Sequence, residues 1–173
     1  FLNAGNEFFK SVTLNEHESK GVLVAIGIPI TRDVLLPMGH TAVEGEIKFP
    51  LAVKIVSRDI AHKTDIGGVR LHVSNAEELA AAVTEVTTNA RNAAPGARLE
   101  GVLVSEMVIG GVETIVGVVI DAGFGPVVVL GMGGVLAEAI RDISYRVAPF
   151  GTVDACAMIE ELRMRSLFEG VRG

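Results

Sequence analysis

Residues 54–69 read KIVSRDIAHKTDIGGV, and the run begins inside an apolar segment, Leu51–Val56. Such a short apolar run predicts a buried strand. Lys54 stands in the middle of that strand. A lysine there must extend its ammonium to solvent, pair with a carboxylate or contact a ligand anion, because an unpaired buried ammonium is costly. The residues themselves leave these three explanations open.

The loop that follows the strand gathers charge and glycine within twelve residues, 57–68. It contains His62, Lys63 and the pair Gly67-Gly68, together with an arginine and two aspartates. Glycines let backbone N–H groups turn toward an anion, and the cations can neutralise it. The spacing of a Walker-type phosphate loop is absent. The alternative is a solvated surface loop, which is common for charged segments.

The surrounding chain predicts strands and helices in uneven alternation. Residues 69–73 and 101–106 are expected to be strands, and 28–36 is expected to be extended and 37–50 a loop. Two helices are expected to start at capping boxes, Thr13 with Glu16 and Ser74 with Glu77. The second helix should bury the apolar side Leu79, Val83, Val86 and Ala90.

The second half predicts a hairpin whose strands, 113–120 and 127–130, flank a turn rich in glycine. A glycine loop, 131–134, is expected to open a helix that extends to about Ile143, and a last helix is expected from Val153 to Phe168 with Thr152 as its cap. This order favours an α+β build with mixed sheets over a doubly wound parallel sheet.

Two acids lie where a strand end meets a glycine hinge. Glu106 ends the apolar strand 101–106, and Glu113 follows Gly110-Gly111. Backbone groups at such a strand end suit an adenine cleft, and the second carboxylate suits ribose hydroxyls. Glutamates at strand ends are also common without any ligand. Glycine loops before helices can likewise bind anions or simply allow close packing.

Composition excludes several classes of protein. The net charge of −6 argues against a nucleic-acid binder, which usually has a basic face. The uncharged run 122–137 is broken by glycines and is too short to span a bilayer, so no membrane partner is expected. A single cysteine, Cys156, fits a reducing and hence cytoplasmic compartment. Four scattered histidines and one cysteine do not support a metal site of the Cys/His type.

Together, three strings resemble the signature of NDP-forming (ADP-forming) acyl-CoA synthetases of the acetate–CoA ligase type. The first is 54–69, which resembles the family's lysine strand followed by Ser-Pro-Asp-x-x-His-Lys-Ser-Asp-x-Gly-Gly-Val. The second is GVLVSEMV at 101–108 with GVE at 111–113. The third is FGP at 124–126 followed by GMGGV at 131–135, with Glu138, Arg141, Asp142 and Arg146 after it. The likeness extends from about residue 14 to residue 173.

The resemblance implies an α+β ATP-grasp fold in which ATP lies between two lobes. It implies that Lys54 holds the α- and β-phosphates and that the loop around His62, with Lys63, Gly67 and Gly68, covers the phosphates. By the same resemblance, His62 corresponds to a phosphoryl carrier between a partner domain and ADP. Arg141 and Arg146 correspond to phosphate clamps. It also implies that Glu106 and the backbone of Met107 and Val108 contact adenine, and that Glu113 binds the ribose hydroxyls.

The resemblance further implies a chain divided into a lead-in, 1–36, a first lobe, 37–107, and an incomplete second lobe, 108–173. The implied reaction converts a carboxylic acid, CoA and ATP into acyl-CoA, ADP and phosphate through a phosphohistidine, with ATP and magnesium as cofactors. The CoA-binding and phosphohistidine domains are expected in the same chain or a partner subunit. The sequence does not decide whether the protein forms a homo-oligomer.

Two departures from the family pattern stand out. Arg58 occupies the position where the family usually has proline. The acidic Glu-x-Asp-x-Asn-Pro strand that supplies magnesium ligands is not present, so the sequence is expected to be a truncated ATP-grasp domain with no acyl-CoA synthesis of its own. The alternative is a regulatory nucleotide-binding domain of a protein acetyltransferase, and a purely structural domain is a third hypothesis.

Overall fold

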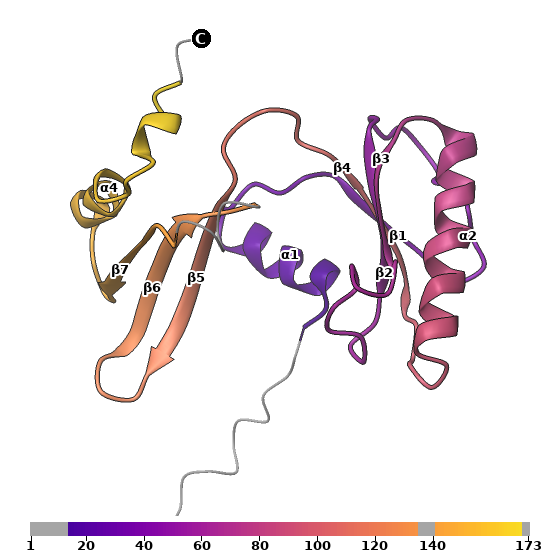
Figure 1. Cartoon of the computed structure of the whole chain (residues 1–173), viewed down its shortest axis with the longest axis horizontal. Coiled ribbons are helices and arrows are strands. Elements are labelled where there is room, and N and C mark those ends of the chain that lie inside the picture. The colour runs from indigo at the N-terminus through magenta and orange to yellow at the C-terminus, as the bar shows by residue number, and fades with distance from the viewer. Residues whose placement is uncertain (1–13, 135–140, 171–173) are drawn as a thin grey trace, which may run out of the picture. The chain divides into compact units, whose positions relative to one another are not determined.

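The computed structural model describes residues 14–134 and 141–170, and the chain divides into two compact units, Phe1–Val108 and Ile109–Gly173 (Figure 1). Each unit combines helices with an antiparallel sheet of its own. This is the α+β build that the sequence predicts, but the expectation of mixed sheets is wrong, because all strand pairs in the described residues are antiparallel.

The first unit contains a four-stranded sheet in the order β1-β4-β2-β3. Its strands are β1 (Asp33–Leu36), β2 (Leu51–Val56), β3 (Val69–Val73) and β4 (Gly101–Glu106). Every neighbouring pair is antiparallel. The two central strands, β2 and β4, are buried along nearly their whole length. The strands predicted at 51–56, 69–73 and 101–106 are therefore confirmed.

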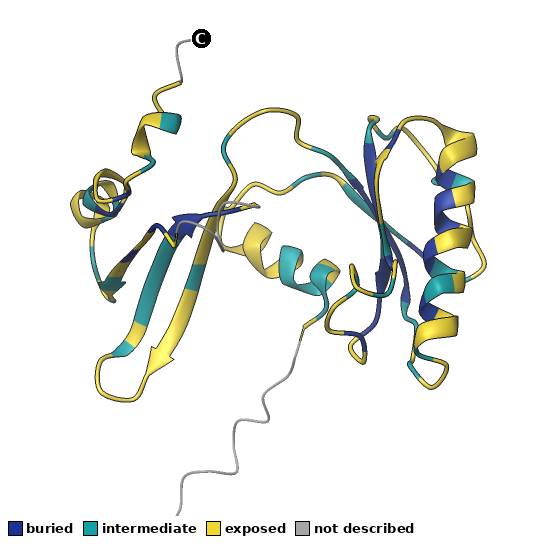
Figure 2. Cartoon of the chain, viewed as in Figure 1, coloured by how far each residue is buried: buried dark blue, intermediate teal, exposed yellow. Residues whose placement is uncertain are grey.

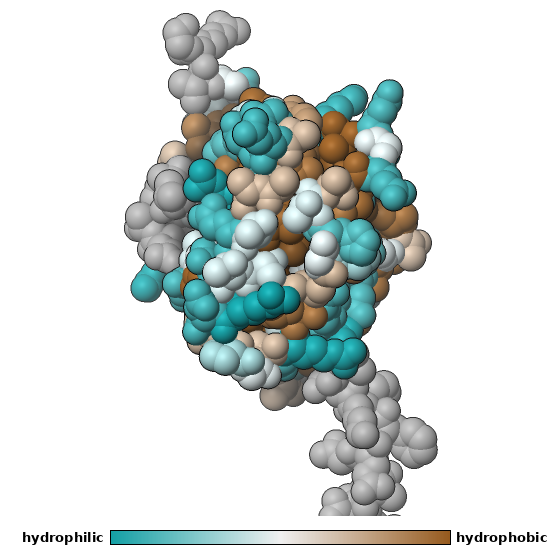
Figure 3. All heavy atoms as spheres, turned by 90° about the vertical axis from the view of Figure 1, so that its right-hand side faces the viewer, coloured by the Kyte–Doolittle hydropathy of each residue, from teal (hydrophilic) through white to brown (hydrophobic). Residues whose placement is uncertain are grey.

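One face of this sheet is covered by α2 (Ala76–Ala93). The predicted apolar side of the helix is buried, and it packs on β-strand residues such as Val53 and Ile55 (Figure 2). The outer surface of the unit carries hydrophilic residues scattered among hydrophobic ones (Figure 3). The other face of the sheet meets α1 (Glu16–Ala25), a helix none of whose residues is buried.

Both predicted capping boxes are wrong, because each helix is capped by a different residue from the one predicted. Asn15 caps α1 and exchanges hydrogen bonds with Glu18, each 2.9 Å long. Glu16, the acid of the predicted box, instead reaches Lys54 on β2. Thr13 lies outside the described residues. At α2 the cap is Asn75, whose side chain accepts from the Glu78 amide. The hydroxyl of Ser74, the predicted cap, donates to the carbonyl of His72.

The second unit contains a three-stranded antiparallel sheet in the order β5-β6-β7. Its elements are β5 (Thr114–Asp121), β6 (Gly125–Met132), β7 (Ile143–Val147), α4 (Thr152–Glu160) and the 3₁₀ turn η1 (Arg165–Leu167). The predicted hairpin is confirmed as β5–β6. The Asp121 carboxylate closes its turn by accepting from the amides of Phe124 and Gly123, which lowers the pKa of Asp121.

Two predicted helices of this unit need correction. Gly131 and Met132 finish β6, and Ile143 opens β7 opposite Gly131, so the predicted helix does not begin at 131 or reach 143. The remainder of that prediction, 135–140 with Glu138, lies outside the described residues. The last helix ends at Glu160 rather than Phe168.

The early end of α4 has a local cause. The buried carboxylate of Asp142 accepts hydrogen bonds of 2.9 Å from the amides of Arg163 and Met164, and these bonds hold the chain in a turn where a helix would continue. Gly151, not Thr152, is the cap residue of α4. The single cysteine, Cys156, is exposed on this helix. No helix in the described ranges 14–134 and 141–170 is both long and apolar enough to cross a membrane.

Candidate functional site: a cationic pocket at the His62 loop

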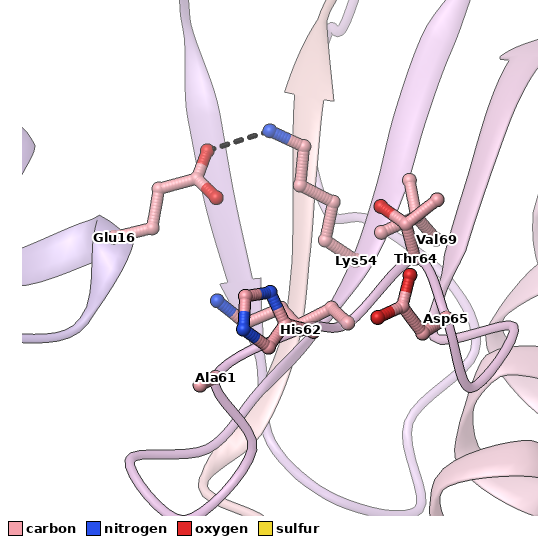
Figure 4. Close-up of a pocket in the computed structure, with 8 residues that line it drawn as sticks. Glu16, Lys54, Ala61, His62, Thr64, Asp65 and Val69 are labelled. Carbon is pink, nitrogen blue, oxygen red and sulfur yellow. Dashed lines mark hydrogen bonds and ion pairs between the residues drawn. The ribbon is translucent and has the colours of Figure 1, made fainter.

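An open pocket of about 390 Å³ lies beside the loop between β2 and β3 (Figure 4). Lys54 enters it from the centre of β2, on the side opposite Val53 and Ile55, because side chains alternate along a strand. The pocket is lined by residues of α1, β2, the loop and β3, most of them polar or charged: Glu16, Lys54, Ala61, His62, Lys63, Thr64, Asp65 and Val69. The topology thus brings together the two features that the sequence singles out, the strand lysine and the loop histidine.

The ammonium of Lys54 pairs with a carboxylate. Its Nζ lies 2.7 Å from Oε1 of Glu16, which α1 carries to the pocket. The two side chains are 28% and 29% exposed, so the pair is partly accessible to solvent and to a solute in the pocket. Of the three explanations for a lysine in this strand, the structure shows the carboxylate partner.

His62 is exposed, and its ring lies by the Glu16–Lys54 pair in the close-up of the pocket (Figure 4). Lys63 is half-buried in the same loop. The pocket therefore offers two ammonium groups and one imidazole, against the carboxylates of Glu16 and Asp65. Such a set suits an anion that presents several oxygens.

The glycine pair of the loop is engaged in the loop itself. The amide of Gly68 donates to the carbonyl of Lys63 at 2.7 Å, and the amide of Gly67 donates to the carbonyl of Thr64 at 3.1 Å. These amides do not form the open anion cradle that the sequence suggests. A Cβ on Gly68 would lie 2.8 Å from Cγ2 of Ile55, so this glycine is required by close packing of the loop on β2.

The segment expected to contact adenine follows β4. The carboxylate of Glu106 accepts from the amide of Lys48 at 2.8 Å. The amide of Met107 donates to the carbonyl of Pro50 at 3.0 Å, so this donor is already satisfied in the ligand-free structure. Val108 is 74% exposed and ends the first unit.

The remaining predicted residues lie in the second unit. Glu113 is exposed just before β5, and the amide of Gly133 donates to its carbonyl at 2.8 Å. A Cβ on Gly134 would lie 2.3 Å from the Glu113 carboxylate, so the glycines of this loop permit close approach. Arg141 is exposed and has a left-handed backbone, with φ of 48°. Arg146 is paired with Glu161.

Metal ligands are not gathered within residues 14–134 and 141–170: no group of three or more His, Cys, Asp or Glu side chains is placed to hold an ion.

The chain is similar to known proteins over most of its length. Residues 9–173 match the family model of an ATP-grasp domain. The chain is 41% identical to the beta subunit of acetate–CoA ligase [ADP-forming] I from Pyrococcus furiosus, over 92% of this chain and 70% of that protein. It is 38% identical to 4-hydroxybutyrate–CoA ligase [ADP-forming] from Nitrosopumilus maritimus, over 95% of this chain and 24% of that protein.

A solved structure is similar over most of the chain. It is the dinucleotide-forming acetyl-coenzyme A synthetase 1 of Ca. Korarchaeum cryptofilum, in complex with coenzyme A and Mg-AMPPCP, with its phosphohistidine segment pointing towards the nucleotide binding site. The sequence identity is 40%, the TM-score is 0.73, and the match covers 91% of this chain and 67% of that chain. The chain belongs to the ATP-grasp domains of ADP-forming acyl-CoA synthetases.

Within this ATP-grasp domain, sequence reasoning missed Glu16 as a pocket residue. Its position 38 residues before Lys54, and its place in an apparent capping box, concealed the contact. The signal that was available is the excess of charge in the first turn of α1, where Glu16, Glu18 and Lys20 follow one another closely.

Arg58, which stands where the family usually has proline, ties the ATP-grasp signature loop to α1. Its guanidinium lies 2.5 Å from the carboxylate of Glu18 and 3.7 Å from that of Glu100. The hydrogen bond from the Asn15 amide, followed by that from Arg58, lowers the pKa of Glu18. The departure thus replaces a stiff residue with an ionic connection to α1.

Proposed function

We propose that the pocket at Lys54 and His62 binds the phosphates of ATP, and that the chain serves an ADP-forming acyl-CoA synthetase. The observation that carries the proposal is the Lys54 ammonium, which projects from a buried strand into a polar pocket beside His62 and Lys63. A charge-assisted contact between an ammonium and a phosphate oxygen is stronger than a neutral hydrogen bond. Family membership supports the same ligand.

We assign the rest of the nucleotide from the family pattern. Glu106 and the backbone of Met107 and Val108 contact adenine, and Glu113 contacts the ribose hydroxyls. Because the Met107 amide already donates to Pro50, the base is recognised by the other backbone groups of this segment. We assign 1–36 to a lead-in, 37–107 to a first lobe and 108–173 to a second lobe. The division of the chain after Val108 supports this boundary.

The catalytic step assigned to this chain is phosphoryl transfer. His62 accepts a phosphoryl group from a histidine of a partner domain and passes it to ADP, or carries it in the opposite direction. Lys54, Lys63 and Arg141 spread the negative charge of the transferred group. Gly67 and Gly68 shape the loop that carries His62. The exposure of His62 supports this role, because a carrier must be reached by two partners in turn.

The whole reaction links a carboxylic acid and CoA to the conversion of ATP to ADP and phosphate. CoA-binding and phosphohistidine domains, in the same chain or a partner subunit, complete it. The lengths of the relatives support such partners. The chain covers 70% of a protein that is named as a beta subunit, and only 24% of a longer ligase. Magnesium belongs to this proposal as the ion that accompanies the nucleotide. Its support is the Mg-AMPPCP bound to the similar structure.

Two further parts of the proposal concern role and location. The ligase names of the similar proteins favour a synthetase over the regulatory domain of an acetyltransferase. The single cysteine favours a reducing compartment such as the cytoplasm.

The test is titration calorimetry with Mg-AMPPNP on wild type, Lys54→Met and Arg91→Met. Lys54→Met removes the phosphate contact, and we expect its affinity to fall by about tenfold or more, as for loss of a charge-assisted hydrogen bond. Arg91→Met removes the same charge from the exposed end of α2 and should bind as wild type. Equal affinity in all three proteins would show that Lys54 does not hold the phosphates.

A further inference from the structure

The carboxylate of Glu16 contacts the ammonium group to which we assign the phosphate. It lies 2.7 Å from Nζ of Lys54 and lines the same pocket. A carboxylate at that distance satisfies one ammonium proton and repels an incoming polyanion. Nucleotide binding at Lys54 therefore has to displace Glu16 or tolerate its charge.

Helix α1, which carries Glu16, is attached by polar contacts. None of its residues is buried, and its apolar side chains, among them Val22 and Val24, are half exposed. Several contacts connect it to the rest of the first unit. Among them, the side-chain amide of Asn15, the cap residue, donates to the Glu100 carboxylate at 2.9 Å, and Lys20 forms an ion pair with Asp33 at 2.7 Å. The Glu16–Lys54 pair is partly exposed, and such pairs exchange at small cost, unlike the Lys20–Asp33 pair, whose carboxylate is buried. The Glu16 side chain can therefore leave Lys54 without disrupting a packed core.

A second cation lies near the displaced carboxylate, and it is at the same time paired with the buried Asp33 carboxylate at 2.7 Å. Nζ of Lys20, one helical turn after Glu16, lies 3.8 Å from the same Oε1. When Lys54 turns to a phosphate, Glu16 keeps a counter-charge within reach on its own helix. The exchange therefore leaves no isolated charge in a partly buried position, which would be the main obstacle to it.

We propose that Glu16 is a built-in competitor for the phosphate subsite: it neutralises Lys54 in the ligand-free domain and moves toward Lys20 when a polyphosphate binds. This inference rests on the proposed function, because it takes Lys54 as the phosphate ligand. Glu16 is then a residue that weakens nucleotide affinity and speeds release, and the loss of its charge tightens binding.

The experiment measures binding of inorganic tripolyphosphate and of Mg-AMPPNP by calorimetry. The variants are Glu16→Gln, Lys54→Met and the double variant. Glu16→Gln keeps the size of the side chain and removes its charge, and we expect a gain in tripolyphosphate affinity of about two- to fivefold, the scale of a partly exposed ion pair. The gain should vanish in the Lys54→Met background. Glu85→Gln, which removes an exposed charge from α2, should bind as wild type and controls for net charge.

The outcomes separate the two proposals. The competitor role is overturned if Glu16→Gln binds tripolyphosphate as wild type does or more weakly, if neither protein binds it, or if the gain persists without Lys54. If wild type and Lys54→Met bind Mg-AMPPNP equally, the proposed function itself fails. Should Glu16→Gln not fold, as judged by circular dichroism, Glu16→Asp keeps the charge but shortens the side chain, and a smaller gain is expected by the same criteria.

Discussion

Arg146 on β7 and Glu161 after α4 form a two-pronged ion pair, with guanidinium-to-carboxylate distances of 2.5 and 3.0 Å. The Ser144 hydroxyl donates to the same carboxylate at 2.6 Å. These contacts, that of Arg146 foremost, lower the pKa of Glu161 from 4.5 to about 2, and the pKa of Arg146 is raised in turn. They join strand and helix within the second unit, and they neutralise a cation that the family pattern assigns to phosphate.

The Glu161 pair should make the second unit sensitive to acid. Because the folded pKa lies below the unfolded one, the pair contributes stability above about pH 4.5 and loses it as the pH falls through about 2. Glu161→Gln should therefore lower the unfolding temperature at pH 7 and make little difference at pH 2. The fluorescence of Tyr145, the single tyrosine and a β7 residue, reports the transition. Glu169→Gln is the control. A difference independent of pH would refute the linkage.

The Lys20–Asp33 pair should be important for the stability of the first unit. The Asp33 side chain is 4% exposed, and Lys20 Nζ lies 2.7 Å from its Oδ2 as an ionic contact without hydrogen-bond alignment. Removing one partner strands a buried charge, so Lys20→Met should cost about 2–4 kcal/mol in the free energy of unfolding. Urea denaturation followed by circular dichroism measures this cost. Lys48→Met, at an exposed lysine, is the control.

The double variant Lys20→Met with Asp33→Leu adds a second arm to this test. An apolar pair of similar volume in place of an ion pair is often tolerated, so the double variant should regain most of the lost stability. If it is less stable than Lys20→Met, the loss arises from packing around Asp33 and not from its unpaired charge.

A side chain at Gly68 should destabilise the first unit. An added Cβ would lie 2.8 Å from the Ile55 side chain and 3.0 Å from the Lys63 carbonyl, so the loop would have to move away from β2. Overpacking of this kind costs about 1–3 kcal/mol, which Gly68→Ala should show in thermal unfolding. Gly96→Ala is the matched control, since nothing lies within 4 Å of the added atom. Equal stability of the two variants would contradict the close packing.

His62 should be needed for turnover but not for nucleotide affinity. In the synthetase that contains this chain, His62→Asn removes the nucleophilic nitrogen, and we expect acyl-CoA formation to fall to background while Mg-AMPPNP binding stays within about twofold of wild type. His72→Asn is a suited control, because His72 is exposed and has a φ of 57°, which asparagine accepts. Turnover that survives in His62→Asn would assign His62 to loop structure alone.

Much of the fold could be predicted because apolar runs and burial coincide. The central strands β2 and β4 contain the apolar runs Leu51–Val53 and Val102–Val104, and α2 has an apolar side that is buried. Strand β7 escaped prediction because its pattern is inverted: Ser144 is buried, whereas Ile143 and Tyr145 are exposed. The end of α4 was missed because it depends on Asp142, a residue far from it in sequence.

The candidate site was predictable in part because two of its residues are close in sequence. Lys54 and His62 belong to one short stretch of chain, so local reasoning places them together. The contact of Glu16 with Lys54 depends on how α1 lies against the sheet, which no local pattern specifies. The sequence also cannot tell whether glycine amides face a ligand or their own loop, and here the amides of Gly67 and Gly68 do the latter.

Cys156 is exposed on α4 and is the single cysteine of the chain. A thiol-reactive dye will therefore attach at one defined point of the second unit without prior mutagenesis. One introduced cysteine on the first unit, for example at the exposed Glu85, completes a donor–acceptor pair. Single-molecule energy transfer can then record the separation of the two units in solution, molecule by molecule, before and after nucleotide is added.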